Sequence, residues 1–175
     1  DDERTADWSA DGQALFYLHN YNAPDTEIRM IERTAAGEWG EPRALFRGDA
    51  FVPAPAPSGR RVAFAVGQTV KLMNAADDSP EVVDLTRGVP GGPRPTYLEW
   101  SADSRTLYFL AVDSADRASI WSVGAGGGTP RQIVAFDDPA RQWHRFGYGL
   151  SAGRFYFTLG DRQSDVWVTE VESSR

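Results

Sequence analysis

An internal repeat is the feature of this sequence that most restricts its fold. Four segments resemble one another, and they cover residues 7–17, 57–64, 99–109 and 150–157. In each, a turn of the Ser-Ala-Asp-Gly kind precedes a strongly apolar run. The turns align at Gly12, Gly59, Ser104 and Gly153, in steps of 47, 45 and 49 residues. A period of this length is typical of four-stranded units and is too long for leucine-rich units.

Each unit has the same expected order of elements. Asp and Ser favour the turn through side-chain bonds to the backbone, and Gly adopts a positive φ. The next run is apolar on both sides, which predicts a strand buried on both faces. These runs are residues 15–18, 62–66, 107–112 and 155–159. Alternating strands follow, around residues 28–30, 70–72, 120–122 and 166–168. Three units then add an outer strand with polar flanks, at residues 42–48, 81–88 and 130–136.

The predicted fold class is all-β, a β-propeller with about four blades visible in the chain. The 11 Pro and 17 Gly interrupt every stretch long enough for a helix. In a propeller each blade lies between two others, which explains strands that are apolar on both sides. We expect a single propeller region over residues 1–175. Its expected blades are 5–48, 49–88, 89–138 and 139–172, and the last of them lacks its outer strand.

Four sequence motifs identify a family that this repeat resembles. They are the Trp-Ser-Ala-Asp-Gly turn at 8–12, the Leu-Tyr-Phe strand at 107–109, the Ile-Trp-Ser-Val strand at 120–123 and the Asp-Leu-Thr-Arg-Gly ending at 84–88. This pattern resembles the WD-like repeat of TolB-type β-propellers, which runs WSPDG, an apolar strand, a strand of IYVMD type and RLTxG. The resemblance covers residues 5–171. It departs from the family at Ala10 and Ala102, where Pro is usual.

The C-terminal stretch, residues 164–171, is similar to the closing segment of propellers fused to bacterial serine/threonine kinases. At the observed period the chain falls short of four complete units, and propellers close with about 4–8 blades. We therefore expect the chain to be the C-terminal part of a longer propeller with six blades. A ring of four blades is the alternative.

Composition excludes several classes of function. The chain has 18 basic and 25 acidic residues, a net charge of −7, so it should repel nucleic acids. It has no cysteine, which removes thiol catalysis and thiolate metal sites and leaves the redox compartment open. With only His19 and His144, a histidine-built zinc site is hard to assemble. We expect no metal and no cofactor.

No apolar run approaches the ~18 residues of a membrane span, so these residues are not expected to contact a membrane directly. The similarity to kinase-fused propellers implies a periplasmic or other extracytoplasmic location, with the cytoplasm as the alternative. The oligomeric state is open.

Two motifs that suggest nucleophilic catalysis and phosphate binding are better explained as turns. Residues 149–153 match the G-x-S-x-G nucleophile elbow, which requires a helix after the serine, whereas a strand is expected here. The glycine run 124–128 has no P-loop Lys and no following helix, so it is predicted to be a hairpin loop. The aligned turn positions Asp11, Ser58, Asp103 and Ala152 vary freely, which a set of catalytic carboxylates would not tolerate. We predict no catalytic residue.

A candidate binding surface lies in the links between blades, near the central channel. The segment 141–148 is rich in Trp, Tyr and Arg, the residue types enriched in interface hot spots. Other links contribute Asp49 and Phe51. The predicted binding residues are Arg94, Tyr97, Arg141, Trp143, His144 and Arg145. Alternatively, Trp143 packs between blades and the charged residues are merely solvated.

These observations favour a non-catalytic module that binds a protein or peptide through loops on a rigid scaffold. The resemblance implies that it could be the sensor region of a larger bacterial protein such as a serine/threonine kinase. The alternative is the propeller cap of a prolyl-oligopeptidase-like serine peptidase, with the catalytic domain outside this chain. An enzyme acting in the channel ranks last, because the first strands offer mainly Trp8, Leu98, Glu99 and Trp100.

Overall fold

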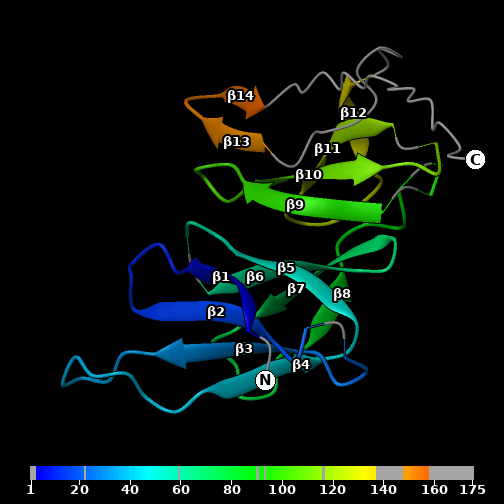
Figure 1. Ribbon diagram of the computed structural model, residues 1–175. Coiled ribbons are helices and arrows are strands. Elements are labelled where there is room, and N and C mark those ends of the chain that lie inside the picture. The colour runs from blue at the N-terminus through cyan, green and yellow to red at the C-terminus, as the bar shows by residue number, and fades with distance from the viewer. Residues whose placement is uncertain are drawn as a thin grey trace, which may run out of the picture.

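The computed structural model of the chain is built from β-strands (Figure 1). It describes residues 3–21, 23–58, 60–89, 91–92, 94–115, 117–136 and 148–157. Within these ranges the chain forms no helix, and so none that could cross a membrane. The predicted all-β fold class is confirmed.

The described strands form three sheets of four and one pair, each antiparallel. The first sheet contains β1 Arg4–Trp8, β2 Ala14–His19, β3 Glu27–Glu32 and β4 Arg43–Arg47. The second contains β5 Ala50–Pro55, β6 Arg61–Val66, β7 Thr69–Asn74 and β8 Val82–Asp84. The third contains β9 Arg94–Trp100, β10 Thr106–Val112, β11 Ala118–Gly124 and β12 Arg131–Ala135. The pair is β13 Tyr148–Ser151 and β14 Arg154–Phe157.

Within every sheet the strands pair in chain order, and the sheets themselves follow one another in chain order (Figure 1). The first strands contact one another, β1 with β5, β5 with β9, and β9 with β13. The fourth strands β4, β8 and β12 lie at the opposite edges of their sheets. The sheets therefore radiate from a common line, as the blades of a propeller do.

The strands expected from the repeat are present where the structure describes the chain. The runs that are apolar on both sides form β2, β6, β10 and β14, and the polar-flanked segments form β4, β8 and β12. The glycine run 124–128 lies between β11 and β12, as a hairpin loop should. The expected strand around 166–168 lies outside the described residues. The expected blade limits stay a prediction.

The Ser-Ala-Asp turns of the first and third sheets have the same hydrogen bonds. The Ser9 hydroxyl donates to Asp11 Oδ1 at 2.6 Å, and the Ala14 amide donates to Ser9 Oγ at 2.8 Å. In the third sheet, Ser101 and Asp103 make the same hydroxyl–carboxylate contact at 2.6 Å. The hydroxyl bonds lower the pKa of Asp11 and of Asp103 from the ordinary value. The motif is thus a structural turn.

The shortened fourth turn is a two-residue hairpin between β13 and β14. Ser151 pairs with Arg154, and the two residues between them have positive φ, 49° at Ala152 and 71° at Gly153. Two consecutive left-handed residues make a type I′ turn, whose twist suits a hairpin. Because a strand follows Ser151, the nucleophile-elbow geometry is absent at this serine.

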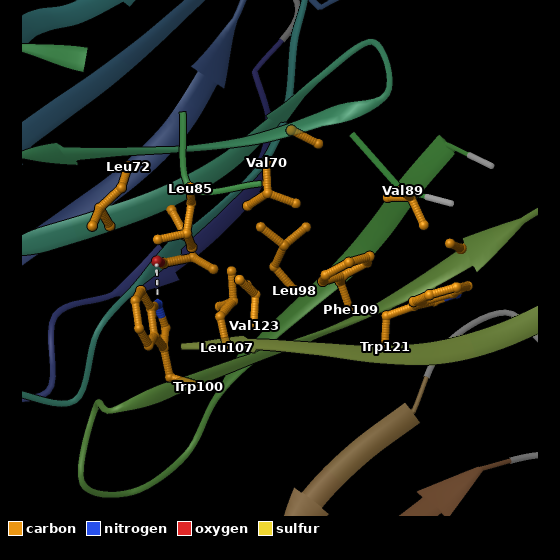
Figure 2. Packing of buried hydrophobic residues seen from close by; sticks show 14 of the residues in the cluster. Val70, Leu72, Leu85, Val89, Leu98, Trp100, Leu107, Phe109, Trp121 and Val123 are labelled. Carbon is orange, nitrogen blue, oxygen red and sulfur yellow. Dashed lines mark hydrogen bonds between the residues drawn. The ribbon is translucent and has the colours of Figure 1, made fainter. Parts of the chain in front are cut away.

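The core lies between the sheets, and β6, the second strand of the middle sheet, buries both of its sides. On β6, Val62 and Phe64 pack with the first sheet, whereas Ala63 and Ala65 pack with the third. Figure 2 shows the cluster between the second and third sheets, where Val70 and Leu85 meet residues of β9 and β10. Alternate residues of β6 thus belong to two different cores, which ties the second sheet to both of its neighbours.

Trp100, the last residue of β9, joins the third sheet to the second. Its indole Nε1 donates to the carbonyl oxygen of Ala54 on β5 at 3.0 Å (Figure 2). The Arg61 guanidinium carbon lies 5.6 Å from the Trp100 ring centroid, and Arg61 Nη2 also donates to the Ser104 carbonyl at 2.9 Å. Trp8 is the equivalent of Trp100 in the first sheet, but it is 51% exposed whereas Trp100 is 7% exposed.

This contrast gives a stability prediction. We expect Trp100→Phe to lower the free energy of unfolding by about 2 kcal/mol, because it removes a buried hydrogen bond and part of a packed ring. The matched change Trp8→Phe should alter it by less than about 0.5 kcal/mol. Urea denaturation of both variants measures the difference. Equal losses would show that Trp100 does not join the two sheets.

Candidate functional site

The first strands surround a cavity of about 600 Å³ at the line where the sheets meet. It is lined by residues of β1, β5, β9 and β13, together with Tyr21 from the loop after β2. Each sheet has four antiparallel strands, so the chain returns before the next sheet and the first strands run in the same direction. Equivalent residues of different sheets therefore lie at the same level of the cavity.

A β-bulge shapes the cavity wall in each of the first three sheets. Thr5, Val52 and Tyr97 all have left-handed backbone conformations, with φ of 48°, 48° and 46°. Each lies three residues before the end of its strand, where the register with the second strand shifts. Non-glycine residues rarely adopt this conformation, least of all β-branched ones. Bulges of this kind redirect side chains beside binding sites, and all three residues line the cavity.

Two packed aromatic rings with an arginine on either side span three sheets at one end of the cavity, and Arg94 is the arginine of the two that lines it. The Arg94 guanidinium carbon lies 3.8 Å from the Phe51 ring centroid. Phe51 meets Tyr21 edge to face at 5.8 Å, and the Arg4 guanidinium carbon lies 5.0 Å from the Tyr21 ring. Stacking on the Phe51 ring orients the guanidinium group of Arg94, which lines the cavity. Tyr97 adds a side chain that is 43% exposed.

Two carboxylates lie at the other end, because Asp7 and Glu99 each stand one residue before the end of a first strand. Burial raises the pKa of Glu99, and the negative charge of Asp7 raises it further. No hydrogen bond from the described residues offsets these effects on Glu99. Burial also raises the pKa of Asp7, although the Trp8 amide donates to its Oδ1 at 2.8 Å. Two carboxylates with raised pKa values, which form no ion pair among the described residues, make this end attractive to a basic group.

Tyr148, the first residue of β13, closes the cavity from the fourth sheet. Its hydroxyl oxygen is buried and has no hydrogen-bond partner within the described part of the chain. Burial raises the pKa of this hydroxyl, and the charge of Glu99 adds to the effect. The hydroxyl stays protonated at neutral pH and can donate one hydrogen bond to a bound group.

The structure brings part of the predicted rim to this cavity. Arg94, Tyr97 and Phe51 line it, but they lie in β9 and β5 and not in links between blades as expected. Asp49 is in the bend before β5. The other predicted rim residues lie outside the described ranges, and they are Arg141, Trp143, His144 and Arg145.

Sequence reasoning missed Asp7, Tyr21 and Tyr148 as cavity residues. The alignment of the turns held a signal for the first of them, since Asp7 precedes Trp8 as Glu99 precedes Trp100. Tyr21 lies in the irregular loop that follows β2. Tyr148 is the last residue of the segment 141–148, which was predicted to bind a partner, but it was not among the predicted binding residues. No repeat pattern points to either.

The described lining of the cavity offers charged, hydroxyl and aromatic groups that can bind a ligand. Its polar side chains are the guanidinium of Arg94, two carboxylates, and threonine and tyrosine hydroxyls. Across the described residues, no group of three or more His, Asp or Glu is arranged to hold a metal ion. His19 is buried away from this cavity's lining, with Nδ1 2.9 Å from Glu3 Oε1. The arrangement fits a ligand with opposite charges at its two ends.

The Glu99 carboxylate provides a prediction on pH. Its pKa is higher in the folded than in the unfolded chain, so stability falls as the pH rises past the unfolded pKa, and the loss is complete above the folded pKa. We expect Glu99→Gln to raise the melting temperature at pH 7, with the gain shrinking as the pH falls toward 4. Thermal denaturation at both pH values measures this. The exposed Glu41→Gln serves as the control, and an equal or lower melting temperature of Glu99→Gln at pH 7 would contradict it.

Comparison with known proteins gives matches to solved structures. No protein-family model matches the chain, and no curated protein matches it. TolB from Acinetobacter baumannii superposes with a TM-score of 0.60 at 14% identity, over 92% of this chain and 41% of that one. A TolB-type protein from Agrobacterium tumefaciens gives 0.58 at 19% identity, over 73% and 47%. Prolyl oligopeptidase B from Galerina marginata gives 0.58 at 15% identity, over 89% and 22%.

The chain spans less than half the length of each of these proteins. Because a TolB protein and a peptidase share the fold, the fold alone assigns no reaction to this chain. The radiating four-stranded sheets and these superpositions establish the architecture. The chain has the β-propeller fold of TolB proteins and prolyl oligopeptidases, and its described residues form three four-stranded blades and one further pair of strands.

Proposed function

We propose that this chain is a non-catalytic binding module that holds a protein or peptide segment in the cavity between its first strands. The observation that carries the proposal is the polarised lining of that cavity. Arg94, stacked on Phe51, lies at one end, and the carboxylates of Asp7 and Glu99, whose pKa values are raised, lie at the other. An extended segment with an acidic and a basic group satisfies both ends.

The size and rigidity of the cavity support this proposal. A volume of about 600 Å³ accommodates a few side chains but not a folded domain. Its walls are sheet strands held by two-sided packing, so little conformational entropy is lost when a ligand binds. The exposed Tyr97 supplies the kind of aromatic anchor that dominates interface energetics. Recognition by a preformed cavity is therefore the mechanism.

The wider setting is also proposed. We place the chain in the extracytoplasmic space of a bacterium, as the sensor region of a larger protein such as a serine/threonine kinase, on its sequence resemblance. The specific alternative is a propeller cap that filters peptides for a serine peptidase, which the similarity to prolyl oligopeptidase B favours. The complete reading frame separates them. A kinase or membrane span upstream supports the sensor, and a hydrolase domain downstream supports the cap.

The cavity residues can be tested with peptides selected from a displayed random library against the purified chain. We expect Arg94→Ala and Tyr97→Ala each to weaken a selected peptide at least about tenfold, or about 1.4 kcal/mol, because each removes an anchor of the cavity. Isothermal titration calorimetry measures the affinity. Arg131→Ala and Ile133→Ala, exposed positions of β12, are the matched controls. Peptides that respond to the controls and not to the cavity variants would refute the proposed site.

The rim proposal extends to Arg141, Trp143, His144 and Arg145 on sequence grounds. We expect the double change Trp143→Ala with Arg145→Ala to weaken the same peptides by a similar factor, since Trp and Arg are frequent hot spots. Calorimetry is again the measurement, with the melting temperature as the check on folding. Unchanged affinity at an unchanged melting temperature would remove this segment from the site.

A further inference from the structure

Opposite charges at the two ends of the cavity lie on one strand, so strand pairing gives the distance between their levels. Arg94 lies opposite Val112 of β10, and Glu99 lies opposite Tyr108. The two levels are therefore four residues apart on β10, whereas the bulge at Tyr97 makes them five residues apart on β9. A strand rises about 3.3 Å per residue, which places the two levels about 13 Å apart along the cavity.

The cavity has the width of one extended chain. Its lining on β9 begins at Arg94 and ends at Glu99, so its volume of about 600 Å³ is spread over this length. The mean cross-section is then about 46 Å², close to the ~48 Å² that one strand occupies when strands lie ~4.8 Å apart and sheets ~10 Å apart. A helix, about 10–12 Å in diameter with its side chains, is too wide. The cavity therefore fits a single extended segment.

Arg94 offers a site for an acidic group at one end of the cavity. Its guanidinium carbon lies 3.8 Å from the Phe51 ring centroid. Arg94 is exposed and forms no ion pair with any described residue. The planar guanidinium presents paired N–H donors that match the two oxygens of a carboxylate. Because the ring already fixes the plane of the guanidinium, a carboxylate binds there at a reduced cost in side-chain entropy.

Three groups with acceptor oxygens surround the other end. After burial, the charge of Asp7 is the next cause that raises the pKa of Glu99, so the two carboxyl groups lie near each other. Burial and then the charge of Glu99 raise the pKa of the Tyr148 hydroxyl, whose oxygen is buried without a hydrogen-bond partner among the described residues. A basic side chain carries several N–H donors and can satisfy both carboxylates and the hydroxyl oxygen together.

Resting on the proposed function, we infer that the cavity selects an extended peptide segment with an acidic and a basic side chain four residues apart in sequence. The acidic side chain binds Arg94, and the basic side chain binds between Asp7 and Glu99, where it donates to the Tyr148 hydroxyl. A spacing of four matches the cavity, because an extended ligand has the same rise per residue as β10.

The alternation of side chains along an extended segment sharpens this inference. Arg94 and Glu99 both line the cavity from β9, so they form one wall of it. Two ligand side chains that are four residues apart point to the same side of an extended segment, whereas a spacing of three or five places them on opposite sides. The even spacing is therefore preferred to either odd one.

The test measures the affinity of the purified 175-residue chain for fluorescein-labelled peptides by fluorescence anisotropy. Each peptide has capped termini and consists of Ser and Ala with one Glu and one Arg, spaced two to six residues apart in both sequence orders. We expect the spacing of four to bind at least about tenfold more tightly than spacings of three and five. Spacings of two and six should also bind weakly, because they match the charged groups at one end only.

Paired substitutions in the chain and in the peptide assign each end. Arg94→Gln should weaken the peptide of spacing four about tenfold and should not affect a peptide with Gln in place of its Glu. Glu99→Gln should weaken the same peptide about tenfold and should not affect a peptide with citrulline in place of its Arg. Arg131→Gln and Glu41→Gln, at exposed positions outside the cavity lining, are the matched controls, and melting temperatures check the folding of all four variants.

The outcomes separate this inference from the proposed function. If Arg94→Ala and Tyr97→Ala weaken library-selected peptides but affinity in the series does not depend on spacing, the cavity is the binding site and the spacing of four is wrong. If the peptide of spacing four responds equally to cavity and control substitutions, its charges bind elsewhere and the inference is overturned. If the cavity variants weaken no library-selected peptide, the proposed function fails and the inference fails with it.

Discussion

Burial of the second strands on both sides is the constraint on which the rest of this structure depends. Phe64 on β6 is fully buried against the first sheet, and Ala63 and Ala65 are fully buried against the third. A large apolar side chain contributes about 1.5–3 kcal/mol when it is fully buried, so neither side of such a strand is stable in water. A sheet with two apolar faces needs two neighbours. Repetition of that requirement, with the right-handed twist of sheets, produces blades around a line.

The cavity is a consequence of that arrangement. The first strands pair with only one neighbour in their own sheet, so their other edges converge without sealing the space between them. The bulges at Thr5, Val52 and Tyr97 place one residue of each strand out of register, and a left-handed β-branched residue costs about 1–3 kcal/mol. The same strain recurs in three sheets, which makes it part of the wall's construction. The chemical groups that the cavity wall offers to a ligand then depend on which residues occupy the first strands.

The sequence is informative about elements that repeat and uninformative about contacts that do not. The second strands and the turns were predictable because Leu15, Val62 and Leu107 recur with a fixed turn before them. Arg94 and Tyr97 were expected in a link between blades, yet they lie in β9, a first strand paired on one side, which tolerates Pro95. None of the three bulge residues is a glycine, so the sequence does not indicate their left-handed backbone conformation. The approach of Asp7 to Glu99 depends on how two sheets converge, which no local pattern encodes.

Comparison of equivalent positions separates what the fold requires from what the cavity contains. At the position of Leu15 the other sheets have Val62 and Leu107, because packing accepts only apolar side chains there. One residue before the end of the first strand, the three sheets have Asp7, Ala54 and Glu99. Since Ala54 serves the fold equally well, the repeat does not require a carboxylate at this position. The carboxylates of Asp7 and Glu99 are therefore a property of the cavity lining and not of the repeat.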